Sequence, residues 1–583
     1  MGRYCLATVL MLATASVSAV EITGVPGSAS ATTTIDGRQL PPPPDTHFGG
    51  KIERNAIDST PYWPPRVVPP KDAPNILLIM TDDAGYGVPG TFGGVIPTPA
   101  LDRIAENGLR YTHFHSTAVC SPTRAALITG RNHHRMGTGS IPELSTGYPG
   151  YNAIMTKDNA TIGRILKEHG YVTSWFGKNH NTPDLQVSKI GPYDQWPIGL
   201  GFDHFYGFMG GDTSQWEPGN LVRNTTYIHP YNDDPDFNLI TAMADEAIDH
   251  MKTVDALNPD QPFFVYYAPG ATHAPHHPTA EWIEKISKMK LFDEGWNKLR
   301  ETIFANQKRL GVIPQDARLT PWQLYDLSKD WTQFNDVSAQ YPEKVKELEK
   351  LFWEEAEKNH VLPLDSTTFT RAILPRPNLS TGRSVFTYSG KVTGTPNGNA
   401  PNVLASSYNI KAEVEIPEGG AEGVIVTHGG RFAGYGFYLL KGKPVYTWNL
   451  FGMERIRWEG PDALTPGKHT LEFDFRYDGL GAETLRYGSP SGLGRSGTGY
   501  LKVDGKVVAT KKMEKTIPQI LQWDENFDVG ADTGSPVDDG DYQTPFHFTG
   551  ELHKLTLTID RPKLSDEDIE KLKAAMHANP ASQ

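Results

Sequence analysis

Apolar runs of strand length alternate with helical patterns across the first half of the chain. The runs have the length and composition of buried strands. The segments between them repeat apolar positions at the spacing of one helix face. The runs are Asn75–Met80, Tyr171–Phe176 and Pro262–Tyr267, and the helical patterns cover residues 98–108, 162–169 and 239–252. Strands that alternate with helices predict an α/β fold with a doubly wound, mostly parallel sheet.

The pattern changes at about residue 366, where Gly and aromatic residues become frequent and short alternating runs replace the helical spacing. Asp504-Gly505 is a typical hairpin turn between two such runs. Several short strands at this spacing predict a β-sandwich or jelly roll. The runs are Lys411–Ile416, Gly423–Thr427, Gly436–Leu440, Pro444–Trp448, Thr470–Tyr477, Tyr500–Val503 and Glu551–Ile559.

These patterns divide the chain into six predicted parts. Residues 1–19 read as a signal peptide, with Arg3 at the charged end and Val17-Ser18-Ala19 as the cleavage site. We therefore expect a secreted or periplasmic protein. The other parts are a Pro-rich extended arm (20–70), the α/β domain (71–335), a helical connector (336–365), the sandwich (366–562) and a C-terminal helix with its tail (563–583).

A charged helix is predicted over residues 342–360, with Val345, Leu348, Leu351 and Phe352 on its inner face. The last helix begins at a capping pattern, Ser565-x-x-Asp568.

Composition narrows the classes of function. The 583 residues carry a net charge of −13 and no basic run, which argues against nucleic-acid binding. No stretch after the leader is long and apolar enough to span a bilayer. Only two cysteines occur, and Cys5 lies in the leader, so the mature chain would keep Cys120 alone and form no intrachain disulfide.

Polar residues follow each predicted strand of the α/β domain. Asp82 and Asp83 follow the first strand, Lys178 and His180 the second, and His273 the third. Ligands of parallel sheets bind at the carboxyl ends of the strands, so these side chains are expected to converge. Two adjacent carboxylates predict a hard-oxygen metal site, although a solvated acidic turn has the same sequence. A single histidine of this kind is more often structural than catalytic.

The segment from Cys120 to Arg131 has the features of an anion site. Ser121 and Pro122 are typical of an N-cap and first helical position, and Gly130 is typical of the helix end. Cys120 would lie just before the helix N-terminus, where an anion is favoured. Arg124 adds a planar cation one turn later. The alternative is a small buried cysteine of no chemical role.

The segment also resembles a known signature. The pattern Cys-x-Pro-x-Arg, followed by Leu-x-Thr-Gly-Arg, is similar to that of the type I sulfatase (arylsulfatase) family of the alkaline-phosphatase-like superfamily. The resemblance implies that Cys120 is oxidised to formylglycine by a dedicated formylglycine-generating enzyme. It further implies that Asp82, Asp83 and residue 120 bind Ca²⁺ or Mg²⁺.

The same resemblance implies roles for the remaining polar residues. The Gly-Lys-x-His segment is like the family's, so Lys178 would contact formylglycine and sulfate, and His180 would hold the formylglycine hydrate. Arg124 would neutralise sulfate oxygens, and His273 would bind sulfate and protonate the leaving alcohol. Asn179 stands where the family often has Trp, which affects the shape of the pocket.

The resemblance covers about residues 40–330, and a segment near Pro321–Leu327 resembles the end of the family's domain. Between these pieces, family members carry a block with a strand that ends in Asp-Asn-Gly and completes the metal shell. No apolar strand followed by Asp-Asn-Gly occurs in this chain. We therefore hypothesise an internally shortened sulfatase that lacks the second metal-binding motif and is joined at Pro321-Trp322.

Three functions follow from the sequence. The first is hydrolysis of sulfate esters, either phenolic sulfates or fragments of sulfated glycans. The second is a catalytically inactive secreted binding protein, whose residues Tyr435, Tyr438, Trp448 and Trp458 would stack on sugar rings. A sandwich core explains these four aromatic residues equally well. The third is phosphate-ester hydrolysis, which the Cys-x-Pro-x-Arg segment disfavours.

Overall fold

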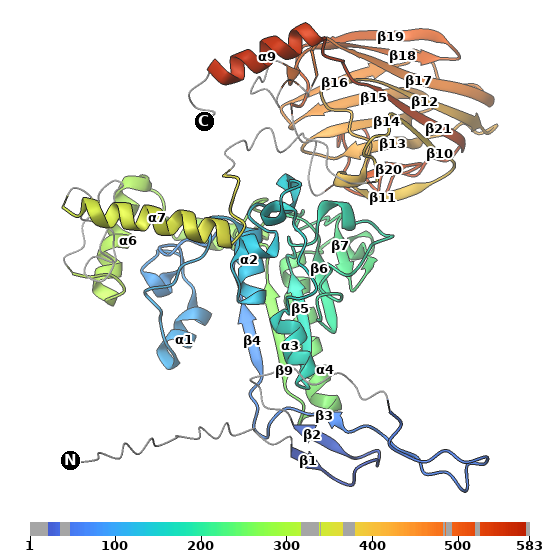
Figure 1. The fold of residues 1–583 in the computed structure, drawn as a ribbon. Coiled ribbons are helices and arrows are strands. Elements are labelled where there is room, and N and C mark those ends of the chain that lie inside the picture. The colour runs from blue at the N-terminus through green and yellow to red at the C-terminus, as the bar shows by residue number, and fades with distance from the viewer. Residues whose placement is uncertain are drawn as a thin grey trace, which may run out of the picture.

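The computed structural model describes residues 21–34, 47–315, 337, 340–364, 379–481, 484, 492–518 and 525–578. The predicted leader and the Pro321-Trp322 junction lie outside these residues. Figure 1 shows an α/β part below and a two-sheet β part above. No helix among the described residues is long and apolar enough to cross a membrane.

A six-stranded sheet forms the centre of the α/β part, in the order β4-β9-β5-β6-β7-β8. Strands β4, β9, β5 and β6 are parallel, and β7 and β8 continue the sheet as antiparallel strands. The parallel-rich sheet predicted from the apolar runs is therefore confirmed. Its strands are β4 (Ile76–Ile79), β5 (Val172–Gly177), β6 (His204–Phe208), β7 (Leu221–Arg223), β8 (Thr226–Tyr227) and β9 (Phe263–Ala268).

Two separate cores cover the two faces of this sheet. Trp175 of β5 points into a core that contains residues of the helices α2 (Cys120–Thr129) and α3 (Ile162–Glu168). Its neighbour Phe176 points to the opposite face, where α4 (Leu239–Leu257) packs. Successive side chains of a strand alternate between faces, so a fully apolar strand serves both cores.

The segment predicted as an extended arm contributes to a small sheet. Strand β1 (Glu21–Thr23) pairs antiparallel with β2 (Thr32–Thr34), and β2 pairs parallel with β3 (Arg66–Val67). This sheet lies at the end of the α/β part farthest from the sandwich (Figure 1).

The C-terminal part consists of two six-stranded sheets, as the short alternating runs predicted. One sheet has the order β10-β21-β12-β17-β18-β19, and the other has β11-β20-β13-β14-β15-β16. The Asp504-Gly505 turn joins β18 to β19, and both residues have positive φ, 50° and 79°.

The strands of the first sheet are β10 (Val385–Tyr388), β12 (Ser407–Ile416), β17 (Gly467–Tyr477), β18 (Gly497–Val503), β19 (Lys506–Met513) and β21 (Glu551–Asp560). Those of the second are β11 (Val392–Pro396), β13 (Gly423–Gly429), β14 (Gly434–Leu440), β15 (Lys443–Leu450), β16 (Glu454–Glu459) and β20 (Asn526–Val529). The helix α9 (Asp566–Ala578) follows, and its predicted cap forms because Ser565 Oγ accepts from the Asp568 amide at 3.1 Å.

The four aromatic residues offered for sugar stacking are buried. Tyr435, Tyr438 and Trp458 are 0% exposed and Trp448 is 2% exposed. The rings of Tyr435 and Trp448 stack at 6.1 Å between centroids. The prediction that these side chains contact a carbohydrate is therefore wrong, because they stabilise the sandwich instead.

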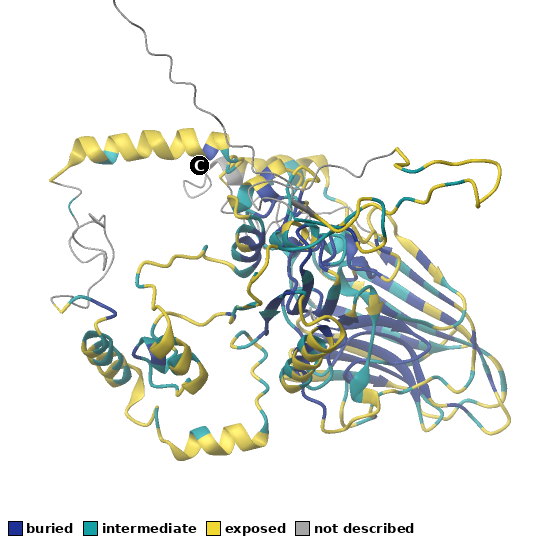
Figure 2. Cartoon of the chain, turned by 90° about the horizontal axis from the view of Figure 1, so that it is seen from below, coloured by how far each residue is buried: buried dark blue, intermediate teal, exposed yellow. Residues whose placement is uncertain are grey.

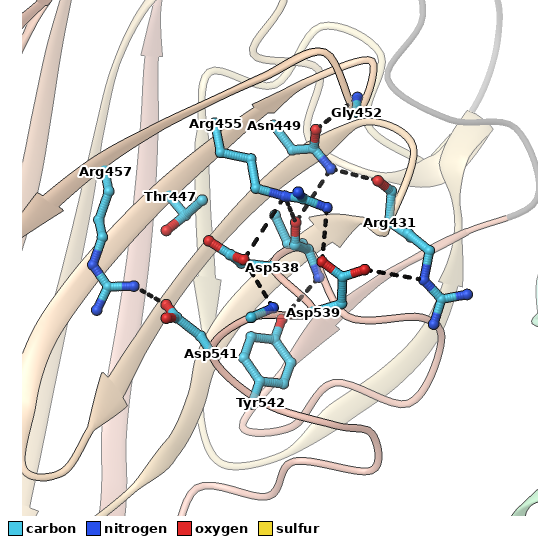
Figure 3. Close-up of polar contacts among 12 residues, drawn as sticks. Arg431, Thr447, Asn449, Gly452, Arg455, Arg457, Asp538, Asp539, Asp541 and Tyr542 are labelled. Atoms are coloured by element: carbon cyan, nitrogen blue, oxygen red, sulfur yellow. Dashed lines mark hydrogen bonds and ion pairs between the residues drawn. The ribbon is translucent and has the colours of Figure 1, made fainter.

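The sandwich lies above the carboxyl ends of the parallel strands (Figure 1), and its loops contact the α/β part. Asn526 Nδ2 donates to the Gly219 carbonyl at 3.0 Å, and the Tyr231 hydroxyl donates to the Thr533 carbonyl at 3.0 Å. Arg431 lies 3.5 Å from Glu217 of the α/β part and 3.7 Å from Asp539 of the sandwich. Figure 3 shows how the Asn449 amide holds the Arg431 carbonyl, at 2.8 Å.

The side of the α/β part beyond β4 has little core. Four helices there bury almost nothing, and Figure 2 shows them as mostly exposed. They are α1 (Pro99–Asn107), α5 (Ala280–Lys288), α6 (Gly295–Leu310) and α7 (Pro342–Lys358). The predicted inner face of α7 is wrong, since Leu348, Leu351 and Phe352 are exposed and Ala356 is its only buried residue.

Strand β4 is itself the edge of the described sheet. It pairs with β9, and no further described strand pairs with its other side. Ile76 and Leu78 pack against the core, whereas Leu77 is 50% exposed and Ile79 is 45% exposed. An unpaired strand with exposed apolar side chains is prone to self-association.

We expect the double variant Leu77→Thr/Ile79→Thr to self-associate less and to bind less of the hydrophobic dye ANS than the natural chain. The change should leave the free energy of unfolding within about 0.5 kcal/mol, because both side chains are already half-exposed. Light scattering and dye fluorescence check the first expectation, and urea unfolding checks the second. The matched control is Leu78→Ala on the core side, which should cost about 1–3 kcal/mol.

Candidate active site

Backbone hydrogen bonds fasten the loops after β4 and β9 to each other. The Asp82 amide donates to the Ala271 carbonyl at 2.9 Å, and the Thr272 amide donates back to the Asp82 carbonyl at 2.6 Å. The loop after β5 carries Lys178 and His180 at the same end of the sheet. The predicted site residues that follow strands thus lie at the carboxyl ends of three neighbouring parallel strands, where ligand sites of such sheets occur.

Helix α2 begins two residues earlier than the sequence predicted. Cys120 is its first residue and Val119 is the N-cap, whereas Ser121 was expected to cap it. The Ser121 hydroxyl is engaged elsewhere, because it donates to the His180 carbonyl at 2.5 Å. The helix ends as predicted, at Gly130 with φ of 65°.

Cys120, His180 and Glu143 form a continuous line of contacts. Cys120 Sγ lies 3.1 Å from His180 Nδ1, and His180 Nε2 lies 2.9 Å from Glu143 Oε2. Glu143 lies in the short 3-10 turn Pro142–Leu144, and its side chain is 13% exposed. Glu143 was not predicted as a site residue. The only signal in the sequence is a Glu in a turn, which occurs on most protein surfaces.

These contacts shift the pKa values of both reactive groups. Burial lowers the pKa of His180, but the Glu143 carboxylate and the hydrogen bond with Cys120 outweigh it and raise that pKa to about 9. Burial raises the pKa of the Cys120 thiol, but the contact with His180 and the charge of Lys178 outweigh it, so that pKa lies below its ordinary value of 9.0.

Asp82 is the anion between two buried cations. Its Oδ2 atom lies 2.6 Å from Lys178 Nζ and 3.4 Å from Arg124 Nη2, and both cationic side chains are 0% exposed. Arg124 also donates to the Lys178 carbonyl at 3.2 Å, which joins α2 to the end of β5. Burial raises the pKa of Asp82, but Arg124 and Lys178 outweigh it, so the pKa lies below 3.8. The Asp82 carboxylate is therefore charged at neutral pH.

The predicted metal ligands do not by themselves fit a metal shell. Ca²⁺ takes 6–8 oxygen ligands and Mg²⁺ needs a near-octahedral set. One carboxylate oxygen of Asp82 is already shared by two cations, and the Asp83 side chain is 64% exposed. In the part of the chain that the structure describes, only Glu415, Glu551 and His553 bring three ligand atoms of His, Cys or carboxylate within 4.8 Å, and these lie on the sandwich.

His273 lies at the rim of this site. Its Nε2 atom is 3.9 Å from Asp83 Oδ2, and its Nδ1 atom is 2.6 Å from the Ala274 carbonyl. A quarter of the side chain is exposed, so it faces both the site and solvent. The structure thus brings Asp82, Cys120, Arg124, Lys178 and His180 together by direct contacts, and places Asp83 and His273 beside them as a pair.

Comparison with known proteins finds relatives of this part of the chain. Residues 74–346 match the sulfatase family model. An uncharacterized sulfatase of Schizosaccharomyces pombe is 30% identical over 295 residues, which are 47% of this chain and 51% of the relative. An arylsulfatase of Klebsiella aerogenes is 29% identical over 288 residues, covering 48% of this chain and 59% of the relative.

The chain thus spans about half the length of these curated relatives. A solved structure of a complex with k-i-k-neocarrahexaose is 25% identical, with a TM-score of 0.30, and the alignment covers 41% of this chain and 53% of that one.

The buried charge cluster gives a stability prediction. We expect Asp82→Asn to lower the free energy of unfolding at pH 7 by about 3–5 kcal/mol, because two buried cations lose their carboxylate. Urea unfolding followed by fluorescence measures the change. The matched control is Asp83→Asn, whose exposed carboxylate should contribute less than about 0.5 kcal/mol.

The difference in unfolding free energy between the natural chain and Asp82→Asn should depend on pH. Because the folded pKa of Asp82 is below its ordinary value of 3.8, the stabilisation is complete above that value and is lost as the pH falls through the folded pKa. The stability gap between the natural chain and Asp82→Asn should therefore shrink below about pH 4. A gap that is constant from pH 7 to pH 3 contradicts a charged Asp82.

Proposed function

Because residues 74–346 form a sulfatase-family domain of the alkaline-phosphatase-like superfamily, we propose that this protein hydrolyses sulfate monoesters at residue 120. The observation that supports this most is the contact network at the strand ends. Cys120 heads α2, His180 touches its Sγ atom, and Lys178 and Arg124 place two cations at the same end of the sheet. These are the groups that an anionic ester and its nucleophile need.

Members of the sulfatase family use a formylglycine and a divalent metal ion. A formylglycine made from Cys120 would supply, when hydrated, a hydroxyl nucleophile for sulfur. The residues around Cys120 fit this group. The His180 ring would hold a hydroxyl at the position of Sγ, and the buried guanidinium of Arg124 lies on the same helix, one turn after residue 120. The enzyme that makes formylglycine is the proposed partner during maturation.

The other residues have separate proposed roles. Lys178, with Arg124, neutralises charge on the sulfate oxygens, and Asp82 keeps both cations fixed in place. His273, which is partly exposed at the rim, donates a proton to the leaving alcohol. A small sulfate ester or a sulfated glycan fits this scheme, since the chemistry involves only the sulfate group and the departing oxygen.

Ca²⁺, or Mg²⁺ in its place, would be held by Asp82, Asp83 and residue 120. These residues provide too few oxygen ligands, and no step above uses the metal. The shortage favours a second candidate function, a catalytically inactive sulfatase-like binding protein that retains the anion site. It also supports the hypothesis of an internally shortened chain. Secretion, or export to a periplasm, follows from residues 1–19 and remains part of the proposal.

Hydrolysis of 4-nitrophenyl sulfate tests the proposed function in protein from its native source. The Cys120 peptide should carry formylglycine by mass spectrometry, and Cys120→Ala should abolish turnover. Lys178→Ala should lower kcat by about 10²–10³-fold, because a cation on the sulfate oxygens is lost. Lys189→Ala is the matched control, since Lys189 binds the Thr393 carbonyl of the sandwich.

An unmodified thiol, or formylglycine without turnover of any sulfate ester, contradicts the proposal and leaves the inactive binding protein. Binding of inorganic sulfate to that protein, lost in Lys178→Ala, would support the second candidate.

A further inference from the structure

The contacts of Cys120 are also those of a nucleophilic thiol in a catalytic site. Cys120 Sγ is 3.1 Å from His180 Nδ1, and the other ring nitrogen is 2.9 Å from the Glu143 carboxylate. A nucleophile, a base and a group that orients the base are thus in contact in the right order. The same arrangement, with Asn as the third member, is used by papain-like proteases on an unrelated fold.

The position of Cys120 at the start of α2 also provides the hydrogen-bond donors that such sites use to stabilise a negative oxygen. Cys120 is the first residue of the helix. The amides of the first turn have no acceptor inside a helix, and Pro122 has no amide hydrogen to contribute. The amides of Cys120 and Ser121 therefore remain as donors for a negative oxygen that develops next to Sγ. Cys120 is partly exposed, so a small substrate reaches it.

The His180 ring is held in its orientation on several sides. Its carbonyl accepts the Ser121 hydroxyl at 2.5 Å, and its side chain is 2% exposed. Gly211 lies against the ring, because a Cβ atom at that position would come within 3.0 Å of two ring atoms. The ring therefore keeps Nδ1 toward Cys120 and Nε2 toward Glu143, which is the orientation that proton transfer from the thiol requires.

We propose that chains in which Cys120 keeps its thiol hydrolyse small activated carboxylic esters by acyl transfer through Cys120. The Sγ atom, whose proton is already held on His180 Nδ1, forms a bond to the carbonyl carbon. The bond to the leaving oxygen then breaks, and His180 returns the proton to that oxygen. Water, deprotonated by His180, next cleaves the thioester to give the acid and the free thiol. Glu143 is a positioning residue that holds His180.

This activity does not depend on the proposed sulfatase reaction, because formation of formylglycine consumes the thiol. The two reactions belong to different states of the same residue. Failure of sulfate-ester turnover therefore leaves the inference intact, and failure of ester turnover leaves the sulfatase proposal intact.

The test uses the full chain, produced without the formylglycine-generating enzyme and with the Cys120 thiol verified by peptide mass. With 4-nitrophenyl acetate, we expect a burst of 4-nitrophenol equal to the thiol content, followed by slower turnover. The Cys120 peptide of quenched samples should carry an acetyl group. Cys120→Ala should remove both the burst and this adduct.

Variants of His180 and Glu143 distinguish an effect on catalysis from an effect on folding. His180→Gln should slow acetylation of Cys120 by about 10²-fold or more, because the base is lost. Glu143→Gln should lower the acetylation rate at least about tenfold with KM and Tm unchanged, and Glu143→Asp should restore part of the rate. Glu217→Gln is the matched control, since Glu217 lies beside Arg431 of the sandwich.

Two outcomes overturn the inference. One is an intact Cys120 thiol that forms no acetyl adduct and gives no 4-nitrophenol beyond the Cys120→Ala background. The other is a His180→Gln protein, folded by its Tm, that is acetylated as fast as the natural chain, which would mean that the thiol reacts without the base. Equal losses in Glu143→Gln and Glu217→Gln would remove Glu143 from the proposed set.

Discussion

The candidate site depends on one buried carboxylate. Asp82 is placed between Lys178 and Arg124, and each cation belongs to a different element, the end of β5 and the first turns of α2. Burying either cation without a partner would be strongly destabilising, and the Asp82 carboxylate offsets that free-energy cost for both. Because Asp82 is also tied to the loop after β9 by two backbone hydrogen bonds, three strand ends and one helix are fixed relative to one another.

Much of this could be predicted from the sequence because the signals are local. The apolar runs of β4, β5 and β9 are long enough for buried strands, and Gly130 ends α2 at a left-handed residue. The convergence of Asp82, Lys178 and His180 also follows, since parallel strands share one carboxyl edge. The strands of the sandwich could be predicted for the same reason, because alternating apolar and polar residues and turn residues are local signals.

Other features depend on contacts between distant residues, which no local pattern encodes. Ser121 has the residue type of an N-cap, yet its hydroxyl goes to the His180 carbonyl, 59 positions along the chain. Glu143 is a site residue only because the short 3-10 turn Pro142–Leu144 places its carboxylate against His180, which follows the end of β5. Tyr435 and Trp448 read as possible sugar platforms, but residue type alone does not distinguish a surface ring from a core ring.

The two deficits of the α/β part occur at the same place. Asp82 and Asp83 lie in the loop that follows strand β4, and their oxygen ligands are too few for a metal ion. The free edge of the described sheet is the other side of this same strand, with Leu77 and Ile79 exposed and the helices α1, α5, α6 and α7 around it poorly buried. A further parallel strand beside β4 would end next to Asp82 and Asp83, and the same strand would cover the apolar side chains of Leu77 and Ile79.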